Sequence, residues 1–165
     1  MATDNQQKLL QKNKQYVATF DKGDLALPPA KKYLVVTCMD ARIDPAAAFG
    51  IDLGDAHVIR NAGGNAKDAF RSILISEHLL GTREIVLVKH TGCGMLTFSN
   101  TDAASVIEKN GSKVPHALDF QPFSDLEKAV ESDVQWLKAN GSLASGVEIS
   151  GWLYEVETGE VRQVA

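Results

Sequence analysis

The chain has 165 residues, of which 44% are hydrophobic and 23% are charged, and its net charge is −4. This length is sufficient for a single domain with its own hydrophobic core, and the composition excludes a disordered chain, a collagen and a disulfide-stapled scaffold. The excess of acidic residues argues against nucleic acid as a partner.

The expected location follows from what the sequence lacks. No segment approaches the roughly 20 apolar residues of a membrane span, and residues 1–8 have no apolar stretch of the kind that a secretory signal requires. The two cysteines are Cys38 and Cys93. We therefore expect a cytoplasmic protein without a membrane partner, in which both thiols remain reduced.

Residues 4–20 are predicted to form the first helix, which is polar and carries a thin apolar face. Its apolar residues are Leu9, Leu10, Tyr16, Val17 and Phe20. Such a face is typical of a helix that docks on a partner subunit, and equally of a frayed surface helix. Residues 23–29 form an extended connector, because Pro28 and Pro29 exclude a helix.

Residues 33–37 form a short apolar segment that predicts a strand buried on both faces, and residues 56–60 and 85–89 are the second and third strand candidates. Between the second and the third, residues 66–80 carry apolar side chains at helical spacing, and Gly81 is placed to end that helix. A strand, a helix and a strand in this order imply a right-handed crossover, and therefore a parallel sheet.

The C-terminal third predicts two further helices. One is short and covers residues 102–109. The other opens with a capping box, in which Ser124 and Glu127 satisfy each other's backbone N–H groups, and ends near Asn140.

A strand at residues 147–156 follows, and residues 161–164 pair back against it. Together the segments predict an α/β fold in one domain, residues 1–165. Its central sheet is mostly parallel, with a four-stranded core and an antiparallel C-terminal strand, and helices flank it.

Chemically active residues follow two of the predicted strands. The first strand runs into Cys38, Asp40 and Arg42, and the third runs into His90 and Cys93. Ligands of an open α/β sheet bind beyond the carboxyl ends of its strands. If the first and third strands are neighbours, two thiols and an imidazole converge there. Two cysteines and one histidine leave one position open on zinc, which is the catalytic pattern.

Two other interpretations of these cysteines are less favoured. Either cysteine taken alone is more often a small buried residue than a ligand. Cys38 as the nucleophile of a phosphatase or sulfurtransferase is disfavoured, because the nearby Asp40 would repel an anionic substrate. The convergence of three ligand types at strand ends favours a metal site over both.

Three motifs in this order resemble the β-class carbonic anhydrases in their short form. They are Cys-Met-Asp-Ala-Arg at 38–42, Val-Ile-Arg-Asn-Ala-Gly at 58–63 and His-Thr-Gly-Cys-Gly-Met at 90–95. The resemblance implies one Zn²⁺ per chain, held by Cys38, His90 and Cys93. It also implies a homodimer, or a dimer of dimers, in which residues 1–29 dock on the neighbouring subunit.

The activity implied by the resemblance is the reversible hydration of CO2 to bicarbonate and a proton by zinc-bound hydroxide. In this interpretation Asp40 orients the hydroxide and Arg42 holds Asp40. If that pair breaks, Asp40 becomes the fourth zinc ligand and the site closes. Gly63 and Gly94 are expected to bind the substrate, with the Gly94 N–H as a donor to its oxygen.

Two alternatives remain open from the sequence. The family also includes carbonyl sulfide and carbon disulfide hydrolases, which use the same zinc hydroxide, and a catalytically silent zinc-binding dimer is the third interpretation. Gly92 stands where many short-form members carry an acid. Arg60 and Asn61 are predicted to brace the backbone or the subunit contact. The remaining histidines are predicted to be structural or exposed: His57, His78 and His116.

Overall fold

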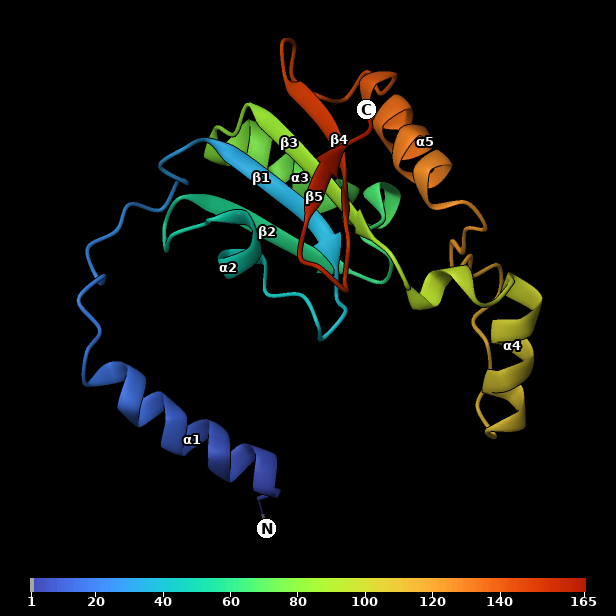
Figure 1. The fold of residues 1–165 in the computed structure, drawn as a ribbon, viewed down its shortest axis with the longest axis horizontal. Coiled ribbons are helices and arrows are strands. Elements are labelled where there is room, and N and C mark those ends of the chain that lie inside the picture. Colours follow the sequence, from blue (N-terminus) through green and yellow to red (C-terminus); the bar gives the residue numbers. More distant parts are fainter. Residues whose placement is uncertain (1) are drawn as a thin grey trace.

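The computed structural model describes residues 2–165. A five-stranded sheet lies at its centre with helices around it (Figure 1). The strands are β1 (Tyr33–Cys38), β2 (Ala56–Asn61), β3 (Glu84–His90), β4 (Glu148–Tyr154) and β5 (Val161–Gln163). The helices are α1 (Asp4–Val17), α2 (Pro45–Phe49), α3 (Ala66–Leu80), α4 (Asn100–Lys109) and α5 (Leu126–Lys138).

The strand order is β2-β1-β3-β4-β5. β1 pairs in parallel with both β2 and β3, β3 pairs in parallel with β4, and β5 runs antiparallel to β4. The predicted sheet, with a parallel core and an antiparallel C-terminal strand, is thus confirmed. The first and third strands are neighbours, which is the condition for the convergence of the three ligand types.

Each face of the sheet has its own apolar cluster. On one face, α3 and α5 pack side chains such as Ile73 and Val134 against Leu34 and Leu87. Each of these four side chains is at most 1% exposed. On the other face, Phe49 of α2 meets the ring of Tyr154 edge-on, with centroids 6.0 Å apart. Strands buried on both faces are near-continuous apolar runs, as the sequence predicted.

The ends of α3 agree with the prediction. Asn65 caps its first turn by accepting from the N–H groups of Lys67 and Asp68. Gly81, with φ of +77°, terminates the helix in the left-handed conformation that glycine adopts without steric cost.

The predicted capping box of α5 is wrong. Asp125, not Ser124, is the N-cap, and its carboxylate accepts from the N–H of Lys128. A charged cap gains more from the helix dipole than a hydroxyl does. Glu127 does not reach back to the cap, because it pairs with Arg162 across the surface.

Other helix boundaries also shifted. Ser99 caps α4 through a capping box with Asp102, so that this helix begins two residues before the predicted start. The first helix ends at Val17 and not at residue 20. The short helix α2, which Asp44 caps and Pro45 opens, was not predicted.

The first helix has no buried residue, and in Figure 1 it lies apart from the sheet, at the end of the extended connector. Its apolar side chains remain exposed, among them Leu9, Tyr16 and Val17 at 66%, 53% and 62%. Over residues 2–165, no helix combines the length and the apolarity needed to cross a membrane.

The contact between α5 and β4 depends on the absence of a side chain at Gly151. A Cβ there would lie 2.5 Å from Val130 Cγ1 and 2.9 Å from Val134 Cγ2. We expect Gly151→Ala to lower the free energy of unfolding by about 1–3 kcal/mol through overpacking, as measured by urea denaturation. The control is Gly141→Ala, where a Cβ meets no atom within 4 Å and the change should stay below about 0.5 kcal/mol. Equal effects in the two variants would contradict this account.

Candidate metal centre

Three ligand atoms converge where β1 and β3 end. Cys38 is the last residue of β1, His90 is the last of β3, and Cys93 follows in the next turn. The parallel register of the two strands brings these ends together. The two Sγ atoms and a ring nitrogen of His90 all lie within 4.8 Å of one another, and all three residues are buried.

One ring nitrogen of His90 bonds the backbone, and the other is left for the cluster of ligand atoms. Its Nδ1 lies 2.9 Å from the carbonyl oxygen of Thr91. Because a carbonyl can only accept, Nδ1 carries a proton, and in the neutral ring Nε2 then carries the lone pair. Nε2 is buried and has no hydrogen-bond partner. A metal ion is the partner that such a nitrogen fits, since ligating histidines commonly donate their other N–H to a carbonyl.

The two thiols form a coupled pair. Their sulfur atoms are 4.0 Å apart, and the hydrogen bond between them lowers the pKa of Cys38 and raises that of Cys93. The N–H groups of Asp40 and Gly63 also lower the pKa of Cys38. The pair therefore loses one proton readily and resists losing the second, because two close thiolates repel. A bound cation removes that resistance, so the donor set fits zinc.

Asp40 and Arg42 form a bidentate pair beside the three ligand atoms. Oδ1 of Asp40 accepts from the backbone N–H and Nε of Arg42, both at 2.9 Å, and Oδ2 accepts from Nη2 at 2.6 Å. These bonds hold the pKa of Asp40 well below its usual range. Oδ2 also lies 3.7 Å from His90 Nε2. Nη2 of Arg42 donates to the carbonyl of Gly92 as well, which anchors the pair to the loop that carries Cys93.

Arg60 and Asn61 brace the backbone, as predicted. Arg60 donates to the carbonyls of Cys38 and Asp40, at 3.0 and 2.7 Å. The side chain of Asn61 exchanges two hydrogen bonds with the backbone of Asn65. The other histidines take structural or exposed positions: His57 bonds Ser76, His78 bonds the Ser142 carbonyl, and His116 is exposed.

An apolar cavity of about 420 Å³ opens at the ligand atoms. Its lining is Cys38, Met39, Asp40, Ala62, Gly63, Cys93, Gly94, Met95, Phe98 and Phe120. Both predicted substrate glycines are therefore part of this wall. Gly63 has φ of +78°, and a Cβ there would lie 2.9 Å from Met95 Cγ. Phe98 and Phe120 were not predicted to line the site, since they come from loops without a recognisable motif.

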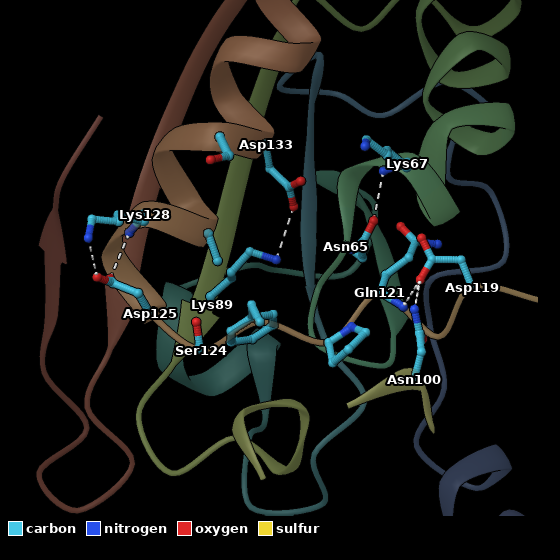
Figure 2. Close-up of a pocket in the computed structure, with 14 residues that line it drawn as sticks. Asn65, Lys67, Lys89, Asn100, Asp119, Gln121, Ser124, Asp125, Lys128 and Asp133 are labelled. Atoms are coloured by element: carbon cyan, nitrogen blue, oxygen red, sulfur yellow. Dashed lines mark hydrogen bonds and ion pairs between the residues drawn. The ribbon is translucent and has the colours of Figure 1, made fainter. Parts of the chain in front are cut away.

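A second cavity of about 490 Å³ is polar and is shown in Figure 2. Lys89 lines it, and its side chain is 1% exposed. The Lys89 ammonium pairs with Asp133 of α5 at 3.0 Å, as Figure 2 shows, and also donates to the carbonyls of Gly63 and Gly64. Lys89 was predicted to lie at the end of an apolar strand, and no role was predicted for it. A lysine within an apolar strand indicates a buried ion pair, because buried lysines are nearly always paired.

Residues 33–161 match the family model for carbonic anhydrase. Beta-carbonic anhydrase 1 of Mycobacterium tuberculosis is 38% identical over 156 residues, which cover 94% of this chain and 94% of the relative. A carbon disulfide hydrolase of Acidithiobacillus thiooxidans is 31% identical over 159 residues, which cover 84% of this chain and 79% of the relative. The solved carbonic anhydrase from Glaciozyma antarctica superimposes with a TM-score of 0.92 at 43% identity, covering 99% of this chain and 100% of that one. A family match of this extent, with relatives at these identities, shows that the chain belongs to the β-carbonic anhydrases, a family of lyases.

Proposed function

We propose that the protein catalyses the zinc-dependent, reversible hydration of CO2 to bicarbonate and a proton. The observation that carries the proposal is the buried, unpartnered Nε2 of His90, which faces two thiols beside a carboxylate that Arg42 holds in place. These groups match what the reaction needs: ligands for one metal ion, a hydrogen-bond acceptor for the attacking water, and an apolar space for a small apolar substrate.

Cys38, His90 and Cys93 are the proposed ligands of one Zn²⁺ per chain. Zinc bound in such a set lowers the pKa of water and so supplies hydroxide near neutral pH. The two thiolates offset the double charge of the ion, so less positive charge remains to stabilise hydroxide. We therefore expect the activity to increase toward mildly alkaline pH.

Asp40 is proposed to orient the nucleophile. Its Oδ2 is held 3.7 Å from His90 Nε2, where it can accept a hydrogen bond from the attacking water and direct a lone pair at the substrate carbon. Arg42 keeps the carboxylate in this position through three hydrogen bonds. The closed state, with Asp40 as a fourth ligand, would require these bonds to break.

Substrate binding is assigned to the apolar cavity. CO2 is small and has no donor groups, so burial next to Phe98, Phe120 and Met95 suits it. Gly63 leaves the space open, and the Gly94 N–H is the proposed donor to a substrate oxygen.

Hydrolysis of carbon disulfide or carbonyl sulfide is the second candidate. Two observations favour keeping it: the 31% identity to a carbon disulfide hydrolase, and the apolar cavity, which suits a linear apolar substrate with sulfur atoms equally well. Turnover of CO2, carbon disulfide and carbonyl sulfide, compared on one preparation, separates the two reactions.

We propose that the protein acts in the cytoplasm as a homodimer, or as a dimer of dimers. The exposed apolar side chains of α1 support this, because a second copy would bury them. The free thiols of Cys38 and Cys93 fit a reducing compartment.

The proposed activity is tested by stopped-flow CO2 hydration from about pH 6.5 to 9, on protein with assayed zinc content. We expect rapid turnover that rises with pH. Negligible CO2 turnover at one zinc per chain, together with fast carbon disulfide or carbonyl sulfide hydrolysis, would replace the proposal with the second candidate. Negligible turnover of all three substrates would leave the catalytically silent dimer.

The ligand assignment predicts that His90→Ala loses zinc. The variant keeps both thiols but loses the neutral nitrogen ligand, and we expect its zinc content after dialysis against a chelator to fall by about tenfold or more. Metal analysis measures this. His116→Ala, at an exposed position, is the matched control and should retain the wild-type zinc content. Full zinc retention by the His90 variant would overturn the ligand set.

Arg42→Gln tests whether the arginine acts by position or by charge. The pKa of Asp40 would rise toward its ordinary value of about 4, so the carboxylate stays ionised at pH 7 in either protein. We therefore expect kcat to fall by about 10- to 100-fold from lost positioning, while the pH profile above about pH 6 keeps its shape. A profile shifted to higher pH would show that the charge matters instead. Arg71→Gln, on the exposed face of α3, is the control.

A further inference from the structure

The Lys89 ammonium is a charge enclosed between the two cavities. Its side chain is 1% exposed, and enclosing a charge to this degree is costly unless every donor is paired. The polar cavity lies on its outer side. On its inner side is the turn of Gly63 and Gly64, which forms part of the wall of the apolar cavity at the proposed metal centre.

All three N–H donors of Lys89 have an acceptor. They are the carbonyl oxygens of Gly63 at 3.0 Å and Gly64 at 3.2 Å, and Oδ2 of Asp133 at 3.0 Å. Asp133 Oδ2 also accepts from the N–H of Ala66, the first residue of α3. The ammonium therefore joins α5, the start of α3 and the glycine turn, and two of its three bonds go to the turn.

The same turn is held from its other side by Asn61. The N–H of Gly64 donates to the Asn61 carbonyl at 3.3 Å, and the N–H of Asn65 donates to the Asn61 side chain at 2.6 Å. The Gly63–Gly64 and Gly64–Asn65 peptide groups therefore each accept from Lys89 through the carbonyl and donate to Asn61 through the N–H. These bonds prevent either peptide group from flipping. Gly64 is also pressed against the sheet, since a Cβ there would lie 3.0 Å from the Val88 carbonyl oxygen.

The orientation of this turn matters to the metal centre in two ways. Gly64 packs against the end of β1, since a Cβ on it would lie 3.0 Å from the Thr37 carbonyl carbon and 3.1 Å from the Cys38 backbone nitrogen, so a shift of the turn would displace Cys38. The α-carbon of Gly63 faces Met95 and Phe123, so a rotation of the turn would alter the width of the apolar cavity.

We propose that Lys89 is a positioning residue of the metal centre. It acts through the Gly63–Gly64 turn and keeps that turn packed against the backbone of Cys38, and Asp133 compensates its charge. This inference rests on the proposed function insofar as Cys38 is taken as a zinc ligand. It extends that function to a strand residue that contacts neither the ligand atoms nor the substrate cavity.

The test removes both charges together, because a buried charge left without its partner destabilises a protein severely. Lys89→Met/Asp133→Asn keeps the length of the side chains and an acceptor for the Ala66 N–H, but removes the donors to the turn. We expect a folded protein by circular dichroism whose zinc dissociates about 10- to 100-fold faster, as followed with a chromogenic chelator. The Co²⁺-substituted variant should show altered thiolate-to-cobalt charge-transfer bands, which a loss of stability alone would not produce.

A second double variant restores part of the lost hydrogen bonding. Lys89→Gln/Asp133→Asn restores N–H donors on a side chain one bond shorter, and we expect a rate of zinc loss between those of the wild type and the methionine variant. Lys67→Met is the matched control, because Lys67 lines the same polar cavity but contacts the Trp136 ring and not the turn. It should lose zinc at the wild-type rate.

Wild-type zinc dissociation and an unchanged cobalt spectrum in the methionine double variant would overturn the proposal. If that variant does not fold, a wild-type rate in the glutamine double variant overturns it equally. CO2 hydration by the wild type, measured on the same preparation, tests the proposed function separately. An enzyme that retains zinc through Lys89 but does not hydrate CO2 would contradict only the proposed function.

Discussion

The parallel pairing of β1 with β3 is the interaction on which the metal centre depends. Cys38 ends one strand and His90 ends the other, and only their pairing brings the two side chains together. The pairing is maintained by burial, since Leu34 and Leu87 on these strands are 0% exposed. Each buried side chain of this size contributes about 1.5–3 kcal/mol. The geometry of the site is therefore a consequence of the hydrophobic core beneath it.

Several polar groups near the site have hydrogen-bond or ion-pair partners within the protein. The Asp40 carboxylate has Arg42, and Nδ1 of His90 has a backbone carbonyl. Lys89 has three acceptors. Against this background the unpartnered Nε2 of His90, enclosed with two thiols, marks the place where a ligand completes the structure. The bracing of the surrounding loops by Arg60 and Asn61 keeps that place rigid.

The sequence predicted the elements of the sheet more completely than the helix boundaries. Apolar runs predicted β1 and β3, because burial on both faces leaves a strong pattern, and helical periodicity predicted the bounds of α3. β2, β4 and β5 were also predicted, although β5 is exposed and β2 has no buried residue. The start of α5 was wrong, because Ser124 and Asp125 both favour an N-cap and residue type alone does not decide between the two. The helix α2 is too short to show a periodic pattern, and its cap and its packing stabilise it.

The sequence alone determined the kinds of atoms available. The spacing of His90 and Cys93, together with Asp40 and Arg42 on one short segment, already implied a metal site with an adjacent acid. The tertiary structure decided what cannot be read from spacing: that β1 lies beside β3, that Phe120 closes the apolar cavity, and that Asp133 on a distant helix neutralises Lys89. The physical reason is that side-chain types and local periodicity are encoded residue by residue. Contacts between distant segments arise only when the whole core is buried at once.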